Sequence, residues 1–139
     1  MKLRRETPRC LGYPVHYDPR LKNLSVSRGM FAWHWIVVGP EFTRLGEREK
    51  GAVLLHEAAH CRLQHRLKRI LWAWIVLVSP SRLLKICQEQ EYEADRFAAG
   101  CGYRDDLVSV FRKLREEADA PYHPSLASRI ERLTRPQGA

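Results

Sequence analysis

The sequence predicts an α+β domain that is mostly helical and carries a small antiparallel β-sheet near its N-terminus. Between Tyr13 and Val38 the residues alternate in polarity or are rich in aromatic and β-branched side chains, as in strands. After Gly39-Pro40 the apolar residues recur at helical spacing. The 139 residues suffice for one domain with its own core, expected over residues 11–134 between a flexible basic arm (1–10) and a flexible tail (135–139).

Three stretches account for the expected sheet. The segments "YPVHY" (13–17) and "LSVS" (24–27) alternate, whereas "MFAWHWIVV" (30–38) is aromatic and β-branched. Arg28-Gly29 lies between the last two and is predicted to form the hairpin turn. Pro40 closes the region, because proline cannot continue a central strand.

The remainder of the chain predicts helices separated by breaks. The expected ranges are about 46–69, 82–100 and 105–118, with a short last helix from 123–124 onward. The apolar run "ILWAWIVLV" (70–78) follows the first helix, and Ser79-Pro80-Ser81 interrupts the chain after it. Gly100 is the expected C-cap of the second helix.

The segment "LLHEAAHCRLQH" (54–65) places histidines on the first helix. At about 100° per residue, His60 lies about 40° from His56, whereas His65 lies about 180° away. The pair therefore shares the apolar stripe that should be buried, and His65 is expected to point away from it. Two histidines at this spacing with Glu57 after the first form HExxH, in which the histidines bind zinc and the glutamate is the general base.

A catalytic zinc site needs a third protein ligand. Leu63 and Arg66 stand where the longer HExxHxxGxxH pattern has glycine and histidine, so that pattern is excluded. On the second helix, Glu91 and Asp95 share an arc with small and apolar residues, and buried carboxylates are rare unless paired or bound to metal. We expect Glu91 to be the third ligand and Asp95 to accept a hydrogen bond from a ligand imidazole.

Two alternatives remain at this point. Cys87 lies one turn before Glu91 on the same face and is a competing ligand. A network of Glu91 and Asp95 with arginines between the helices would explain the inward acids without a metal.

Glu57 lies at about 60° from His60, where a base can approach a metal-bound water without coordinating the metal itself.

With these residues identified, the chain resembles the gluzincin metallopeptidases of the HtpX and CAAX prenyl protease family. HEAAH at 56–60 matches their HExxH, and EYEAD at 91–95 matches their ExEAD. "HPSLASRIERL" (123–133) and "IVVGPEFTRL" (36–45) are similar to two further segments of that family. The resemblance covers about residues 23–133. Many members of the family carry transmembrane helices, which are not expected in this sequence.

The resemblance implies a zincin-like fold with one Zn²⁺ per chain, held by His56, His60 and Glu91. It implies that Glu57 is the catalytic base and that Asp95 is a supporting residue. By the same resemblance, the candidates for stabilising the transition state lie in the C-terminal segment and are Tyr122, His123 and Arg129. We also assign His123 a catalytic role. The alternative roles of these three residues are packing and helix capping. The peptide substrate would dock along an edge strand at residues 23–27, which includes Asn23, Leu24, Ser25 and Val26.

The predicted function is therefore a zinc-dependent metalloendopeptidase acting on polypeptide. The alternative is a latent or non-catalytic zinc-dependent protein that binds peptides or regulates a partner. Nucleic acid is disfavoured as a partner because the basic residues are scattered, no nucleic-acid motif is present, and such a function leaves the inward acids unexplained.

The formal net charge of +8 is compatible with acidic partners. The basic residues Arg62, Arg66, Lys68 and Arg69 precede Trp72 and Trp74, so Arg62–Val78 is a candidate peripheral membrane contact. The alternative is that the helix continues and these side chains cover the core or a dimer contact. The nine apolar residues from 70 to 78 fall short of the roughly 20 that span a bilayer.

The first nine residues lack an apolar signal core, which predicts a cytoplasmic protein. Its four cysteines, none in CxxC spacing, are expected to be free thiols, although a disulfide stays open.

Overall fold

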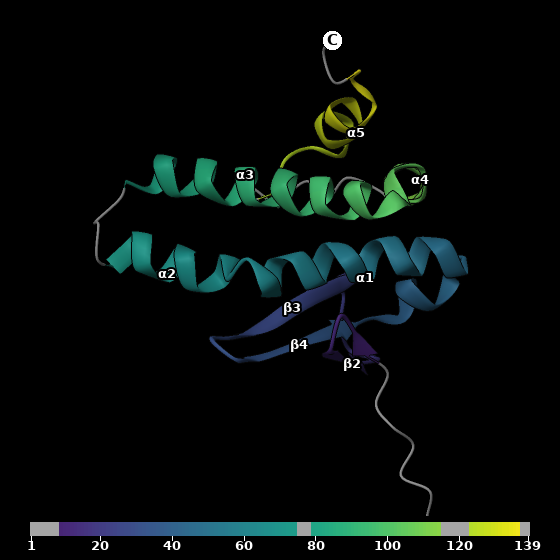
Figure 1. The fold of residues 1–139 in the computed structure, drawn as a ribbon, viewed down its shortest axis with the longest axis horizontal. Helices are drawn as coiled ribbons and strands as arrows, with labels where there is room; N and C mark the ends of the chain where they lie inside the picture. Colours follow the sequence, from purple (N-terminus) through teal and green to yellow (C-terminus); the bar gives the residue numbers. More distant parts are fainter. Residues whose placement is uncertain (1–8, 75–78, 115–122, 137–139) are drawn as a thin grey trace, which may run out of the picture.

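A computed structural model of the chain describes residues 9–74, 79–114 and 123–136 and confirms the α+β class (Figure 1). A small sheet lies against one side of α1, α3 packs along the other side, and α5 lies beyond α3 (Figure 1). The strands are β1 (Arg9–Cys10), β2 (Tyr13–Tyr17), β3 (Ser25–Met30) and β4 (Trp33–Val38). The helices are α1 (Glu47–Arg62), α2 (His65–Trp74), α3 (Pro80–Ala98), α4 (Arg104–Lys113) and α5 (Leu126–Thr134), with short helical turns η1 (Pro40–Arg44) and η2 (Ala99–Tyr103).

The sheet is mixed, so the prediction of a wholly antiparallel sheet is wrong in one pairing. The strand order is β1-β2-β4-β3, and β2 pairs with β4 in parallel while the other two pairings are antiparallel. The physical reason is the apolar end of β4, where Ile36, Val37 and Val38 are buried. A strand that is this apolar occupies the centre of the sheet. Residues 18–24 therefore carry the chain from β2 past β4 to β3 at the edge.

The hairpin turn lies at Phe31-Ala32 and not at Arg28-Gly29. Gly29 is the last residue but one of β3 and pairs with His34 of β4. Its φ is +96°, and a Cβ there would lie 1.8 Å from the carbonyl oxygen of Trp33. The glycine thus permits a close approach of the two strands immediately before the turn. Phe31 has a φ of 57°, an uncommon value for a residue with a side chain.

The predicted long helix over 46–69 is broken into α1 and α2. Leu63 and Gln64 separate the two helices, and Gln64 has a φ of 54°. The Gln64 side chain binds the hairpin turn, because its Nε2 donates to the Phe31 carbonyl at 2.7 Å and its Oε1 accepts from the Phe31 N–H at 3.2 Å. His34 of β4 also donates from Nε2 to the same Oε1, at 3.1 Å. These contacts hold the sheet against the helix break.

The other helix ends also differ in detail from the prediction. α3 ends at Ala98, and the residue with positive φ is Gly102 (φ 89°) in η2, so Gly100 is not the left-handed cap. α5 begins at Leu126 with Ser125 as N-cap, so Pro124 is not its first residue. Ser125 Oγ accepts from the backbone N–H of Ser128 at 3.1 Å, which satisfies a free donor of the first turn.

Both ends of the chain are described only in part, and none of the four cysteines forms a disulfide. β1 occupies the last two residues of the expected basic arm (1–10), and of the expected tail (135–139) only residues 135–136 are described. Cys10, Cys61, Cys87 and Cys101 are free thiols, as expected. Within the part of the chain that the structure describes, no helix is both long and apolar enough to cross a bilayer.

Glu49 ties the start of α1 to α4. Its carboxylate accepts from the Gly46 N–H at 2.9 Å and from Ser109 Oγ at 2.6 Å, and it lies 2.7 Å from Lys113 Nζ. The hydrogen bonds from Lys113, Ser109 and Gly46 lower the pKa of Glu49 from its usual 4.5 to about 2. The ionised carboxylate therefore stabilises the fold above pH 4.5, and this contribution is lost as the pH falls through about 2.

We expect Glu49→Gln to lower the free energy of unfolding at pH 7 by about 1–2 kcal/mol, because hydrogen bonds to a charged group are lost while solvent screens the half-exposed Lys113. Urea unfolding at pH 7 and at decreasing pH checks this, and the difference from the unmodified chain should shrink below pH 4.5. Glu47→Gln is the matched control, since that side chain is 92% exposed on the same turn. Equal stability of both variants at pH 7 would contradict the assignment.

Candidate metal centre

Two neighbouring helices bring His56, His60 and Glu91 together. The histidines lie one turn apart on α1, and Glu91 faces them from α3, which packs along α1 (Figure 1). All three are buried, with exposed fractions of 7, 8 and 3%. The three form a group whose ligand atoms could hold a metal ion. This is the set predicted from helical phase, and Cys87 is not part of it among the described residues.

The three side chains approach one another through ring nitrogens and carboxylate oxygens, which are atoms that can bind a metal ion. His56 Nε2 lies 3.1 Å from His60 Nε2 and 3.3 Å from Glu91 Oε2, and His60 Nε2 lies 3.4 Å from Glu91 Oε1. Two imidazole lone pairs and a carboxylate at these distances repel unless a positive charge lies between them. A proton on one imidazole satisfies part of this requirement, and a divalent cation satisfies all three groups. Nitrogen and oxygen donors of this kind suit zinc.

Asp95 supports His56 from the side away from the other two groups. Its Oδ1 lies 2.9 Å from His56 Nδ1, without the alignment of a good hydrogen bond. Burial disfavours a charged imidazole at His56, but the contacts with Asp95 and Glu91 outweigh it and raise its pKa to about 10. A metal ion that bound here at neutral pH would therefore displace a proton from His56, so the affinity for metal should fall in acid.

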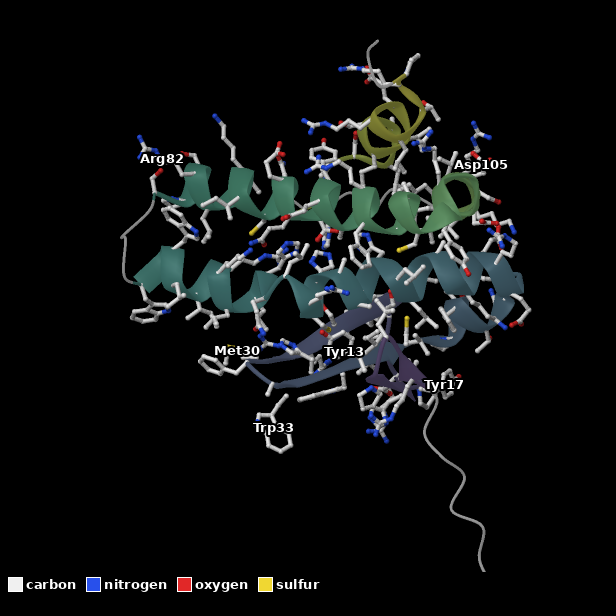
Figure 2. All side chains as sticks on the ribbon, viewed as in Figure 1. Tyr13, Tyr17, Met30, Trp33, Arg82 and Asp105 are labelled. Carbon is white, nitrogen blue, oxygen red and sulfur yellow. The ribbon has the colours of Figure 1, made fainter. Side chains whose placement is uncertain are left out.

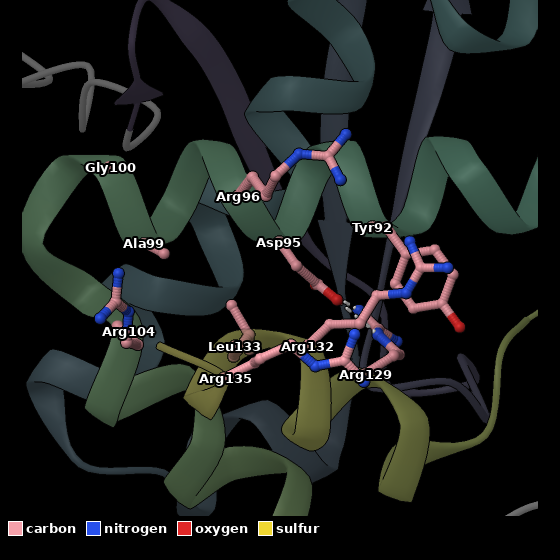
Figure 3. A pocket seen from close by; sticks show the side chains of 10 residues that line it. All are labelled: Tyr92, Asp95, Arg96, Ala99, Gly100, Arg104, Arg129, Arg132, Leu133 and Arg135. Carbon is pink, nitrogen blue, oxygen red and sulfur yellow. Dashed lines mark hydrogen bonds and ion pairs between the residues drawn. The ribbon is translucent and has the colours of Figure 1, made fainter. Parts of the chain in front are cut away.

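Arg129 of α5 holds Asp95 in place. Its Nε donates to Oδ2 at 2.8 Å and its Nη2 donates to Oδ1 at 2.6 Å, and Figure 3 shows the two side chains meeting between α5 and α3. Burial opposes ionisation of Asp95, yet the contacts with Arg129 and His56 keep its pKa below the usual range. The guanidinium also lies 4.2 Å over the Phe111 ring. Arg129 was a candidate for stabilising the transition state, but its Nε–Nη2 edge forms a bidentate pair with Asp95, so the geometry favours a supporting role.

His65 does not point away from the pair, and the prediction that it faces the opposite side is wrong. The break at Gln64 rotates the start of α2, so that His65 is 1% exposed and its Nδ1 lies 2.8 Å from His60 Nδ1. Its Nε2 donates to Glu93 Oε2 at 2.9 Å. Burial and the neighbouring His60 lower the pKa of His65 to about 4, so it is neutral at pH 7.

Glu57 is buried next to the pair and contacts the sheet. Its Oε1 accepts from Ser25 Oγ at 2.7 Å. Ser25 and Val26 begin β3, which is an edge strand in the described sheet, whereas Asn23 and Leu24 precede it as a bend. The predicted edge strand and the predicted base are thus in direct contact, which sequence reasoning did not foresee.

The C-terminal segment reaches the same group. His123 Nδ1 lies 3.5 Å from Glu91 Oε2, although the His123 side chain is 53% exposed. Arg129 Nη2, from the same segment, lies 3.8 Å from the Glu91 carboxylate. Arg69 of α2 also lies near this carboxylate, with its Nη2 at 3.5 Å. Burial opposes ionisation of Glu91, but its contacts with His123, His56 and His60 hold its pKa well below the usual range. Tyr122, the other predicted residue of this segment, lies outside the described residues.

Comparison with family models, with curated proteins and with solved structures finds no match to this chain. The class of protein that the fold and the site define is an α+β domain with a buried His-His-Glu group that could hold a metal ion.

Proposed function

We propose that the protein is a zinc metalloendopeptidase of the gluzincin type, with His56, His60 and Glu91 as ligands of one zinc ion. The observation that supports this best is the approach of two imidazole nitrogens and one carboxylate to within 3.1–3.4 Å of one another inside the fold. The HEAAH and EYEAD segments, which resemble those of the HtpX-like family, supply these residues in the order that the family has.

The chemistry is divided between the metal and this chain's own residues. His56, His60 and Glu91 would hold the zinc ion, which would supply a water of lowered pKa and polarise the peptide carbonyl. Glu57 would act as the general base that takes a proton from the attacking water and passes it to the leaving amine. The hydrogen bond from Ser25 orients the Glu57 carboxylate, and β3 offers its free edge to an extended peptide.

The direct test is digestion of casein by the zinc-loaded protein. We expect cleavage that a chelator abolishes and that added zinc restores. A zinc-loaded protein that cleaves neither casein nor a set of unfolded substrates would contradict the proposal.

A latent form is the second candidate, because the C-terminal segment lies against the proposed zinc ligand Glu91 through His123. In that case His123→Ala should raise casein cleavage by the zinc-loaded protein. If His123 instead stabilises the transition state, the same substitution should lower cleavage while zinc content stays unchanged. A variant that leaves both the rate and the zinc content unchanged would remove His123 from either role.

Peripheral membrane contact through residues 62–78 is part of the proposal, and residues 75–78 lie outside the described structure. Trp74 at the end of α2 is 78% exposed, and Trp33 near the hairpin turn is 81% exposed and projects from the sheet away from α1 (Figure 2). Exposed tryptophans, together with the exposed basic residues Arg66 and Lys68 of α2, suit an anionic bilayer surface.

We expect the chain to co-sediment with anionic vesicles at low salt, and the double substitution Trp33→Ala, Trp74→Ala to reduce the bound fraction. Neutral vesicles are the control. Absence of binding to anionic vesicles at low salt would exclude this contact.

A further inference from the structure

The helix break after α1 places His65 next to the candidate metal centre. Gln64, with its φ of 54°, is fixed by two hydrogen bonds to Phe31, and this conformation directs the next residue inward. His65 is consequently buried to 1% exposure between α1 and α3. A second contact holds it there, since Gln90 Nε2 donates to the His65 carbonyl at 3.3 Å.

We propose that His65 and Glu93 are positioning residues that fix the proton of His60 on Nδ1 and thereby present its Nε2 lone pair to the metal. The inference rests on the proposed function, because it requires His60 to be a ligand. It adds a role for two residues whose side chains do not belong to the His56-His60-Glu91 group.

The positions of the protons follow from the contacts in turn. The Glu93 carboxylate can only accept, so the proton between it and His65 is on His65 Nε2, 2.9 Å away. A neutral imidazole then has an acceptor at Nδ1. The Nδ1 of His60 lies 2.8 Å from that acceptor and must be the donor, since two acceptors at this distance would repel each other. His60 therefore keeps its lone pair on Nε2, the atom that faces His56 and Glu91.

The two metal-binding histidines are thus supported in different ways. Asp95 meets His56 Nδ1 directly and is itself fixed by Arg129. For His60 a neutral imidazole is inserted before the carboxylate, and the Glu93 side chain is 42% exposed. Partners of this kind orient the ligand ring and fix its tautomer. His65 also fills the space beside His60, and the two rings stand edge to face with centroids 4.9 Å apart.

The test measures zinc affinity by competition with a chromophoric chelator for three substitutions. His65→Leu removes the acceptor and should weaken zinc binding by roughly 10–100-fold, the usual cost of losing a support of this kind. His65→Asn offers an amide oxygen near the position of Nδ1 and should retain most of the affinity. Glu93→Ala should weaken binding by a smaller factor, and Glu89→Ala is its matched control because Glu89 is an exposed residue on the same helix.

Two further readouts separate positioning from a general effect on the fold. The helical content of the zinc-free protein, measured by circular dichroism, should be unchanged in His65→Leu, because leucine is apolar and of similar size. Nitrogen-15 NMR of the zinc-loaded unmodified chain should show the His60 proton on Nδ1, hydrogen-bonded to His65. A His65→Leu variant with unchanged zinc affinity would overturn the inference and leave the proposed function intact. An unmodified chain that binds no zinc would overturn both.

Discussion

Glu57→Gln is expected to bind zinc as the unmodified chain does and to lose peptide hydrolysis by roughly 10²–10⁴-fold, the contribution of a positioned general base. Glutamine has the same shape as glutamate and can still accept the hydrogen bond from Ser25 Oγ, which is 2.7 Å from Glu57 Oε1. It cannot take a proton from water at neutral pH. Metal content and casein turnover measured on the same preparation check both halves of this prediction.

Two variants serve as controls for this result. Glu47→Gln makes the same chemical change on the same helix at a side chain that is 92% exposed, and it should leave turnover unchanged. Ser25→Ala removes only the hydroxyl that orients the carboxylate, so its loss of turnover should be much smaller than that of Glu57→Gln. Full turnover by zinc-loaded Glu57→Gln would remove this residue from the mechanism.

The second large effect is expected from Glu91→Gln, which should weaken zinc binding by more than the roughly 10–100-fold typical of a supporting residue. The substitution removes the negative charge that faces His56 and His60 at 3.3 and 3.4 Å. Peptidase activity should fall with the loss of zinc and should recover in part at high zinc concentration. Chelator competition and activity measured over a zinc titration give the two quantities.

Glu89→Gln is the matched control, since Glu89 lies two residues earlier on α3 and its side chain is 61% exposed. That variant should bind zinc with unchanged affinity. If Glu91→Gln and Glu89→Gln bound zinc equally well, Glu91 would not be a ligand, and the alternative of an acid–arginine network between the helices would explain its burial.

The face that carries the metal group was predictable because helical phase is a local property. The spacing of His56 and His60, and the placement of Glu91 and Asp95 among small residues, depend only on the helices continuing through those positions. The pairing of the two helices followed from the need of buried polar groups for partners. Arg129 was named for a different role, and its use as the partner of Asp95 depends on where α5 packs.

His65 was misplaced because the helix break has no local signal. Neither Leu63 nor Gln64 is a usual helix-ending residue, and Gln64 adopts its φ of 54° while its side chain binds the Phe31 backbone, 33 residues earlier. A contact between such distant segments overrides the local preference for continuing the helix. Extrapolating one helical phase across that position put His65 on the side opposite His56 and His60.

The sheet shows the same limit. Alternation and composition located the strands, but the choice of neighbours depends on which strand is most buried. Ile36, Val37 and Val38 make β4 the central strand, and this places β2 parallel to it. Gly29 was taken for the turn because glycine is typical of turns, whereas here it allows β3 to approach the Trp33 carbonyl.

The central claim is that His56, His60 and Glu91 hold one divalent metal ion, and native mass spectrometry of protein purified without denaturation in the presence of zinc tests it most directly. The account predicts a mass increase corresponding to one zinc ion per chain, which a strong chelator removes. A folded chain that carries no stoichiometric zinc under these conditions would contradict the metal centre and the peptidase function proposed from it.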